Sequence, residues 1–387
     1  MAVQISDLSA VMKEFYIGPV RRQLNDSTVV LANLEKTNRH VEGRKIFIPL
    51  SYGGGAAVGS KAEYATLPTA HKQTYKETDG RTKYHYGRIE VTGPAIKATA
   101  NDVGAFLRVI GSEMKGVLRD LRKDLNRQLF GDGTGLLAVV PDATAGAANQ
   151  IVVDSASKLV VGMEIDVHEA DYGSVLGSST ITAISGTTVT VALADIEALL
   201  SEDDCNVTRK GAYLNELEGF KLAVATAGTY FGIDRASYDF WKAQVTTGDT
   251  TLSLDVLQTG IDEVDIAGGL CDTFISTHAL RRKLASLMVA KQEYRNTMEL
   301  KGGFKVLSYN DIPVMADKDC PAETFYFLDR SSFAIYHMSD WEWAEENGSV
   351  LTKVSGKDAY EAWIFWYSNL GSDFCACQNV YTAMKTS

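Results

Sequence analysis

RDLRKDLNRQLFGDGTGLLA, residues 119–138, joins the end of a long helical pattern to a short glycine-rich segment. Apolar side chains recur every three or four positions from residue 103 to residue 130, which predicts a single helix about 42 Å long. The opposite face is charged, so the apolar stripe is narrow and the helix is expected to support a lobe on one side only. The stripe consists of Phe106, Ile110, Met114, Val117, Leu118, Leu121, Leu125 and Leu129.

The glycine-rich segment raises the question of a nucleotide site, because glycine loops can cradle phosphate groups. Such a loop follows a strand and opens a helix, whose first amides and positive dipole bind the anion. Here the glycines follow the end of a helix, which carries carbonyl groups and negative dipole. We therefore interpret Gly131, Asp132, Gly133, Thr134 and Gly135 as a helix cap and a hinge into the next domain. A nucleotide-binding enzyme that uses this loop is the alternative from another functional class.

Residues 44–93, upstream of the helix, are predicted to form a long β-hairpin with a flexible tip. Residues 45–52 have the composition of a strand, residues 53–60 are glycine-rich, and the Asp79-Gly80 pair is a strong hairpin-turn signal. We interpret this hairpin as polar on both faces, so it has little apolar surface to fold against its own chain and is expected to lie on a neighbour. The preceding residues, 1–43, lack a convincing core pattern and are predicted to be an arm.

Downstream of the helix, the pattern changes twice. Short β-branched runs between residues 146 and 210 predict a small inserted β-barrel or sandwich, with a hairpin turn at Ser185-Gly186. A mixed α/β pattern follows. It predicts helices over 214–225, 252–267 and 278–290, strands over 272–276, 304–306, 312–315 and 325–328, and a central, fully buried strand over 363–367.

Composition and charge exclude several functional classes. The chain has 387 residues, of which 45% are hydrophobic, and a net charge of −11. Residues 1–130 carry 20 basic against 13 acidic residues, whereas the remainder carries 18 against 36. This acidic surplus argues against sequence-specific DNA binding and leaves only non-specific contact with DNA. We see neither a secretory signal nor a run approaching the roughly 18 apolar residues that a membrane span needs, so no membrane association is expected.

None of the possible catalytic or metal-binding patterns in the sequence indicates an active site or a metal site. Ser112 and Lys115 match an SxxK pattern, but they lie in the middle of the predicted helix, without the tripeptides that accompany that pattern in serine acyl-enzymes. Acidic groups around residues 202–204, 262–265 and 317–319 do not follow calcium-loop spacing. The five cysteines are scattered and the six histidines lie far from them, which indicates buried free thiols. We therefore expect no enzyme activity, no cofactor and no metal.

The order of the elements resembles a tailed-bacteriophage major capsid protein of the Hong Kong 97-type fold. The resemblance is carried by GRIEVTGPAIKAT (87–99), by the helix end quoted above, by YFGIDRASYDFWKA (230–243) and by DAYEAWIFWYSNLG (358–371). It implies an α+β fold with an N-arm, an E-loop hairpin, a P-domain containing a spine helix, and an A-domain. The domains implied are the N-arm 1–43, E-loop 44–88, P-domain 89–145, an inserted β domain 146–212, A-domain 213–320 and a β-rich return to the P-domain 321–387.

The resemblance also implies partners and a location. The chain is expected to assemble with itself into hexamers and pentamers of a virion shell in the host bacterial cytoplasm, with scaffolding, portal and decoration proteins as further partners. An encapsulin, a cellular compartment with the same fold, is the alternative within the structural class. The inserted domain lies where the common core has none, so its role is not inherited. The E-loop residues expected at inter-subunit contacts are Tyr52, Gly53, Gly54, Gly55, Lys61, Tyr75, Lys76 and Arg81.

Some relatives lock their shells by joining an E-loop lysine to an asparagine of another subunit, beside a glutamate. The candidate lysines here are Lys61, Lys72, Lys76 and Lys83, and the candidate partners lie in the Glu-Glu-Asn-Gly stretch 345–348. That stretch has the composition of a surface turn, and solvated lysines stay charged and inert. We therefore expect no covalent cross-link.

Overall fold

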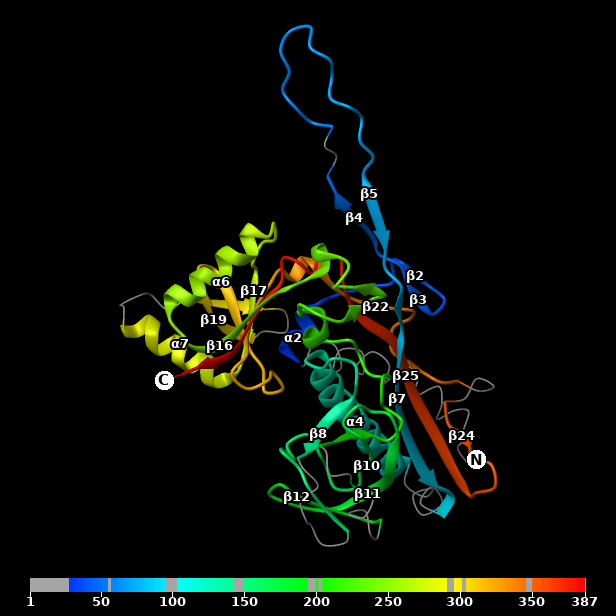
Figure 1. Cartoon of the computed structure of the whole chain (residues 1–387). Coiled ribbons are helices and arrows are strands. Elements are labelled where there is room, and N and C mark those ends of the chain that lie inside the picture. Colours follow the sequence, from blue (N-terminus) through cyan, green and yellow to red (C-terminus); the bar gives the residue numbers. More distant parts are fainter. Residues whose placement is uncertain are drawn as a thin grey trace. The chain divides into compact units, whose positions relative to one another are not determined.

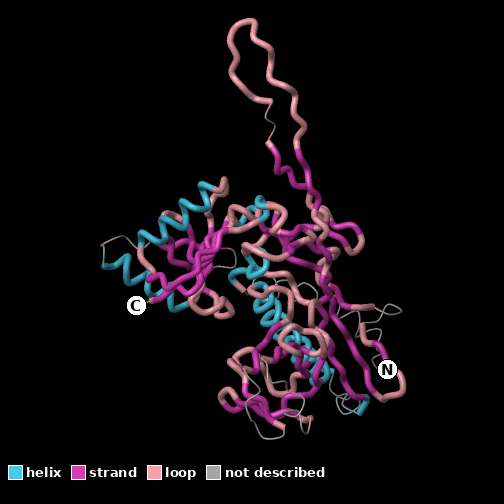
Figure 2. Tube along the Cα trace, viewed as in Figure 1, coloured by secondary structure: helices cyan, strands magenta, loops and turns pink. Residues whose placement is uncertain are grey.

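The computed structural model describes residues 28–54, 57–94, 103–141, 149–193, 200, 204–290, 296–300, 304–345 and 350–386. The chain forms two compact units: unit 1 comprises residues 1–130 and 220–387, and unit 2 comprises residues 131–219. Figure 1 shows the elements and Figure 2 shows that strands outnumber helices. The predicted α+β class is confirmed.

Unit 1 is built on the predicted long helix, α4 (Val103–Leu129), which packs on strand β7 (Lys83–Thr92). In the described part of the apolar stripe, Val117 is half-buried and the other members are buried: Met114, Leu118, Leu121, Leu125 and Leu129. The helix approaches the strand closely at Gly87, where a Cβ atom would lie only 2.7 Å from the side chains of Val117 and Leu121. The helix and the sheet therefore share one apolar layer, and a glycine in β7 makes the close approach possible.

The sheet of this layer is centred on β25 (Ala359–Ser372), which pairs with β7 over ten residues. Its other partners are β22 (Phe333–His337), β23 (Glu342–Trp343) and β24 (Thr352–Lys353), and β22 also pairs with β1 (Glu35–Thr37). The central position predicted for residues 363–367 is confirmed, but full burial was wrong. Trp363 is 39% exposed while Trp366 is 1% exposed. The strand alternates because α4 packs against one face of the sheet only.

A seven-stranded sheet forms the second layer of unit 1, in the order β16-β26-β21-β17-β20-β19-β18. In that order the bounds are Gln244–Thr251, Asn379–Lys385, Phe325–Leu328, Thr273–Ser276, Ile312–Ala316, Phe304–Tyr309 and Asn296–Leu300. Helices α6 (Leu254–Ile266) and α7 (His278–Ala290) accompany it. The predicted return of residues 321–387 to the P-domain needs correction, because β21 and β26 belong to this second sheet. Their apolar side chains pack with α6 in one core.

Two local predictions need correction, one because of a backbone angle and one because of packing. The helix predicted over 214–225 is reduced to one turn, α5 (Phe220–Ala223). Leu214 has a φ of +59°, which is a left-handed conformation that a helix cannot contain. The predicted arm 1–43 contains helix α2 (Val29–Asn33), whose residues Val30 and Leu31 are each 1% exposed. This part of the arm is core of unit 1, and residues 1–27 lie outside the described residues.

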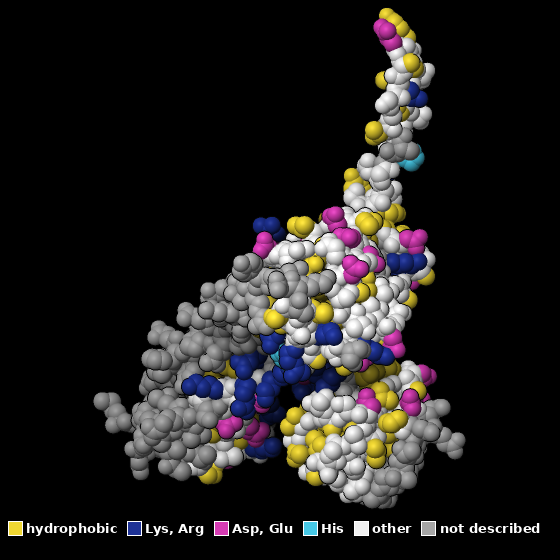
Figure 3. Space-filling model, turned by 90° about the vertical axis from the view of Figure 1, so that its left-hand side faces the viewer, with side chains coloured by type: hydrophobic (Ala, Val, Ile, Leu, Met, Phe, Trp, Pro, Cys, Tyr) yellow, Lys and Arg dark blue, Asp and Glu magenta, His cyan; other side chains and the backbone are white. Residues whose placement is uncertain are grey.

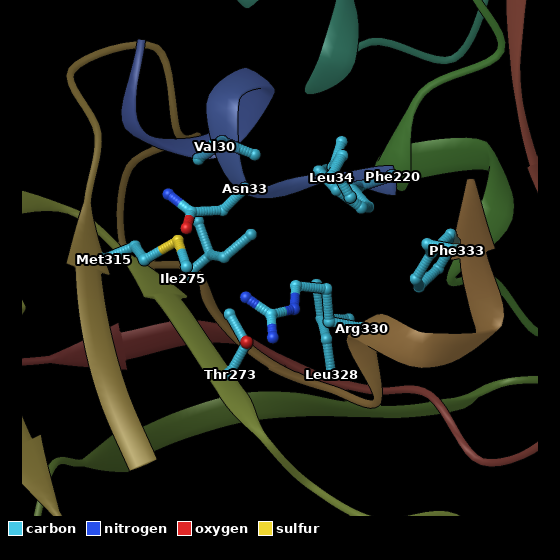
Figure 4. Close-up of a pocket in the computed structure, with 10 residues that line it drawn as sticks. All are labelled: Val30, Asn33, Leu34, Phe220, Thr273, Ile275, Met315, Leu328, Arg330 and Phe333. Atoms are coloured by element: carbon cyan, nitrogen blue, oxygen red, sulfur yellow. The ribbon is translucent and has the colours of Figure 1, made fainter. Parts of the chain in front are cut away.

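Figure 4 shows how α2 joins that core. Val30 and Asn33 of the helix face Thr273 and Ile275 of β17 around a small cavity, with Arg330 beside them. The cavity has a volume of about 10 Å³, which is the space of one water molecule. The segment that precedes the hairpin is thus fixed to the second sheet by close packing.

Unit 2 is one six-stranded sheet around one apolar core, in the order β8-β13-β10-β11-β12-β9. In that order the bounds are Leu136–Val140, Cys205–Arg209, Glu164–His168, Val175–Ser185, Thr188–Val191 and Gln150–Val152. The predicted turn at Ser185-Gly186 connects β11 to β12, with Gly186 at a φ of +62°. The amide of Asp154, just after β9, donates to the carbonyl of Val139 in β8, so the two ends of the sheet meet.

Candidate assembly surfaces

The hairpin of unit 1 consists of two ladders in one register. Strand β3 (Lys45–Ile46) pairs with β6 (Gly80–Arg81), and β4 (Pro49–Gly53) pairs with β5 (Thr74–Glu77). Two corrections follow. Residues 83–92 leave the hairpin and join the sheet as β7, where the side chains of one face are buried. The Asp79-Gly80 pair lies inside an arm of the hairpin and is not its turn.

Gly80 instead allows the backbone to pack closely against the ring of Phe231. A Cβ atom there would lie 2.1 Å from a ring carbon of Phe231, so any side chain would collide with this ring. The amide of Asp79 donates to the carbonyl of Phe231 at 2.9 Å. Phe231 itself has a φ of +49°, a strained conformation for a non-glycine residue. The base of the hairpin is thus seated on the turn between β14 (Thr229–Tyr230) and β15 (Ile233–Asp234).

We call residues 229–241 the socket, because aromatic residues of this segment hold the next part of the hairpin too. The Tyr52 ring stacks on the Phe240 ring with centroids 4.3 Å apart. The Lys76 ammonium lies 4.9 Å from the centroid of the Tyr238 ring, which is a cation–π distance. Tyr52 and Lys76, which were predicted to contact another subunit, therefore have partners in their own chain.

Arg235 holds the socket together from within. Its side chain is fully buried and donates hydrogen bonds to the carbonyls of Trp241, Leu222 and Ala223 at 2.9–3.0 Å. Burial lowers the pKa of this guanidinium, and the carbonyls replace the water that the charge has lost. The socket is also tied to the first sheet, since the Tyr230 hydroxyl donates to the Leu370 carbonyl of β25 at 2.8 Å. The direction of the hairpin is set by this connected framework.

The tip of the hairpin, residues 57–73, has a different character. It contains no strand, and its large apolar side chains are open to solvent: Val58 is 91%, Leu67 81% and Tyr64 fully exposed. Figure 3 shows hydrophobic side chains along this projection, interspersed with charged ones. Lys61 is also exposed. The tip is an apolar surface without a covering element among the described residues.

The other predicted contact residues lie next to the tip or at the base of the hairpin. Gly54 and Tyr75 are exposed, the latter to 68%, whereas Gly55 lies outside the described residues. Gly53 sits opposite Thr74 at a β-bulge, where a Cβ atom would lie 2.5 Å from the threonine hydroxyl oxygen. Arg81 uses its carbonyl to accept a hydrogen bond from Asn369, which fixes the base to β25.

The glycine-rich segment 131–135 begins at the boundary between the two units. Asp132 accepts hydrogen bonds from the backbone amide and the hydroxyl of Thr134, which makes a tight local turn. Gly133 and Gly135 have φ values of +82° and +81°, whereas Gly131 is not left-handed. The Thr134 amide is therefore occupied by Asp132, and the turn follows a helix C-terminus, as predicted. This geometry does not provide a phosphate cradle.

Two of the three acidic groups that the sequence singled out have structural partners, whereas residues 202 and 203 of the third group lie outside the described residues. Glu263 of α6 accepts hydrogen bonds from Asn379 and Tyr381 of β26. Asp317 and Asp319 both accept from the amide nitrogen of Asn126, and burial raises the pKa of Asp317. Within the described ranges, no three metal-ligating side chains come together. These carboxylates connect elements of unit 1.

The structure describes only some of the residues in the SxxK pattern and in the possible cross-link stretch. The side chain of Ser112 and residues 346–348 of the cross-link stretch lie outside what the structure describes, while Lys115 is exposed on α4. All five cysteines are buried and free. No helix in the described part of the chain is long and apolar enough to cross a membrane.

Sequence reasoning missed one surface. Five aromatic side chains, which we call the aromatic face, lie on the side of β7 and β25 that is less buried: Tyr84, Tyr86, Trp363, Phe365 and Tyr367. The available signal was an aromatic residue at every second position, at Tyr84 and Tyr86 in KYHYG and at Trp363, Phe365 and Tyr367 in WIFWY. The aromatic face was missed because residues 363–367 were interpreted as a fully buried strand.

The comparisons with known proteins concern family and fold. The family model described as SU10 major capsid protein matches residues 25–356. The structure is similar to the cyanophage A-1(L) capsid asymmetric unit, with a TM-score of 0.56 and 15% identity over 92% of this chain and 93% of that one. It is also similar to the capsid of an empty GTA particle, with a TM-score of 0.51 and 8% identity over 93% and 90% of the two chains.

A likeness to the holo-SrpI encapsulin complex of Synechococcus elongatus has a TM-score of 0.49 and 8% identity over 92% of this chain and 88% of that one. This score is too low to support a choice between a viral and a cellular shell. No curated protein matches the chain.

Proposed function

Because this chain belongs to the SU10 major capsid protein family, we propose that it builds the icosahedral head shell of a tailed phage through hairpins laid on neighbouring copies. A structural role in a capsid follows from the family, and the Hong Kong 97-type fold agrees with it. The finer points are proposals: hexamers and pentamers as the building units, assembly in the host cytoplasm, and DNA held without sequence preference.

The proposal about the hairpin rests on the difference between its base and its tip. Its base is fixed by the socket, whereas its tip exposes Val58, Tyr64 and Leu67 almost completely. A two-stranded hairpin is marginally stable alone, and exposed apolar side chains gain free energy only when another surface covers them. A rigid base with an apolar tip suits an element that reaches a neighbour. Among the predicted contact residues, Lys61 and Tyr75 then belong to the contact and Tyr52 and Lys76 to the base.

Unit 2 is proposed to be an inserted accessory domain that strengthens contacts between capsomers from the outer surface. Its first and last strands, β8 and β13, pair with each other, so the chain enters and leaves the sheet side by side. The glycine turn at 131–135 is proposed to be the hinge of this domain. Scaffolding, portal and decoration proteins are proposed as further partners.

Electron microscopy of the purified chain tests the proposal, with a variant that lacks the hairpin tip. Closed shells from the full chain and capsomers or single subunits from the variant would support it. Equilibrium dialysis with ATP and NAD tests the enzyme alternative, for which the turn at Asp132 gives no geometric basis.

A further inference from the structure

Helix α4 carries a row of basic side chains on the side that its apolar stripe leaves free. Their positions in the sequence repeat at helical spacing, which places them on one face of the helix. We call them the basic face: Lys115, Arg119, Arg122 and Lys123. Both lysines are exposed, Arg122 is half-buried, and the side chain of Arg119 is 61% exposed. The four positive charges therefore lie together at the surface of unit 1.

Carboxylates neutralise little of this charge. The acidic side chains of the helix follow a different edge, at Glu113, Asp120 and Asp124. The Arg119 guanidinium lies 3.6 Å from the Asp120 carboxylate, but both side chains are largely exposed, and such a pair contributes little free energy. In the part of the chain that the structure describes, no carboxylate forms an ion pair with the other three members of the basic face.

The spacing of these charges matches that of a nucleic-acid strand. From Lys115 to Lys123 the helix rises by about 12 Å, and four positive charges lie along that length. One strand of duplex DNA carries a negative charge for about every 3.4 Å of its axis, so it presents three or four phosphates over the same distance. The basic face and a DNA strand therefore have similar linear charge densities of opposite sign.

The composition of the basic face favours a nucleic acid over an acidic protein. Protein interfaces are anchored by aromatic and apolar side chains. In the described part of α4, the apolar side chains all belong to the stripe that packs towards β7, and the aromatic face lies on the opposite side of that sheet. DNA needs no apolar anchor, because the release of its counterions drives the binding.

The rest of the chain does not offer a comparable surface by its overall charge. Residues 131–387 carry 18 basic against 36 acidic residues, and this surplus repels phosphate groups. A basic row within an acidic protein confines the contact with DNA to one place. Each copy then makes only a few weak contacts that depend on salt and not on base sequence.

We propose that the basic face of α4 contacts the phosphate backbone of the DNA that the shell encloses. The inference rests on the proposed function, in which the shell holds DNA without sequence preference, and it names the surface that makes the contact.

Acetylation of lysines in assembled particles tests the contact directly. Particles filled with DNA and the same particles emptied of DNA are treated with acetic anhydride, and the modified peptides are quantified by mass spectrometry. Lys115 and Lys123 should react several-fold faster after the DNA has been removed, because phosphates no longer cover their amines. Lys353 and Lys357 of the β24–β25 turn are also exposed and should react equally in both samples.

A salt titration of the purified chain gives a second readout. Binding to a short DNA duplex of random sequence is measured by fluorescence anisotropy at several salt concentrations. Lys115→Gln with Lys123→Gln should reduce the slope of log K against log salt concentration by about 2, since each phosphate contact contributes about 0.9. Glutamine keeps the helix preference of lysine. The control, Lys353→Gln with Lys357→Gln, removes the same charge and should leave the slope unchanged.

The outcomes separate this inference from the proposed function. An unchanged slope in the α4 variant, or equal acetylation of Lys115 and Lys123 in filled and emptied particles, would overturn the inference and leave the shell proposal intact. Tighter binding to polyglutamate than to the duplex would also overturn it, in favour of an acidic protein partner. Failure of the unmodified chain to form closed shells would overturn the proposed function on which the inference rests.

Discussion

The ring of Phe231 occupies the space that a side chain at Gly80 would need, with a ring carbon 2.1 Å from the place of the missing Cβ atom. This contact seats the hairpin on the socket, and the neighbouring Asp79 amide adds a hydrogen bond to the same residue. The direction in which the hairpin leaves unit 1 thus depends on one glycine and one strained phenylalanine.

Gly80→Ala is therefore expected to loosen the base of the hairpin. Overpacking of this kind destabilises a protein by about 1–3 kcal/mol. Denaturant unfolding measures this loss, and hydrogen exchange at the Asp79 amide reports the socket directly. Gly116→Ala is the control, since a Cβ atom there meets nothing within 4 Å. In a helix this change should stabilise the chain by about 0.5–1 kcal/mol. Equal effects at the two positions would refute the close-packing role of Gly80.

The chain is expected to lose stability in acid through His85. This side chain is buried, and burial lowers its pKa to about 4, with Asp124 acting in the opposite direction and Lys83 in the same direction. Below pH 6.5, the approximate pKa of an unfolded histidine, His85 binds a proton in the unfolded chain but stays neutral in the folded chain. The free energy of unfolding should therefore be highest above pH 6.5 and should fall as the pH drops towards 4.

Between pH 7 and pH 5 the titration of His85 should lower the free energy of unfolding by about 2 kcal/mol. His85→Phe removes the titration, and the described structure gives the buried Nε2 atom no partner that the change would strand. Denaturant unfolding at both pH values should show a smaller acid-induced loss for the variant. Parallel pH profiles of the two proteins would show that His85 is not the cause.

Unit 2 is expected to be removable as a whole. Replacing residues 136–210 with a short Gly-Ser linker takes out all six strands, and the thermal transition of unit 1 should remain cooperative because each unit is compact and has an apolar core of its own. Replacing only residues 147–210 leaves β8 without its partner and exposes Leu137 and Val140. This shorter replacement should aggregate. A non-cooperative unit 1 after the full replacement would contradict the division into two units.

We expect the mature shell to contain no covalent cross-links. Of the candidate lysines, Lys76 lies over the Tyr238 ring of its own chain and Lys61 is exposed to solvent. A solvated ammonium is protonated at neutral pH and is not a nucleophile. Denaturing electrophoresis of boiled particles should give one band near the chain mass of 42.1 kDa. A ladder of covalent oligomers would disprove this expectation.

Periodicity predicted the elements that carry strong local signals. The spine helix matches its expected bounds to within a residue, and α7 has the bounds predicted for residues 278–290, with the Thr277 hydroxyl accepting from the Leu280 amide at its start. These features depend on neighbours in the sequence. The same holds for the turn at Ser185-Gly186.

The errors arose where tertiary contacts override local preference. Asp79-Gly80 has the composition of a turn, but the glycine is required by the distant Phe231 ring. The run at Trp363 looks buried because it is aromatic, yet no described element of the chain covers that face. The socket itself was not predicted, since Arg235 acts through backbone carbonyls that carry no sequence signal.

Electron microscopy of assembly shows directly whether this chain forms a closed shell through its hairpin. The full chain is compared with a variant in which residues 57–72 are replaced by Asn-Gly, which keeps β4 and β5 paired. We expect uniform polyhedral shells from the full chain, and only capsomers or dispersed subunits with an unchanged thermal transition from the variant. Normal shells from the variant would contradict this expectation.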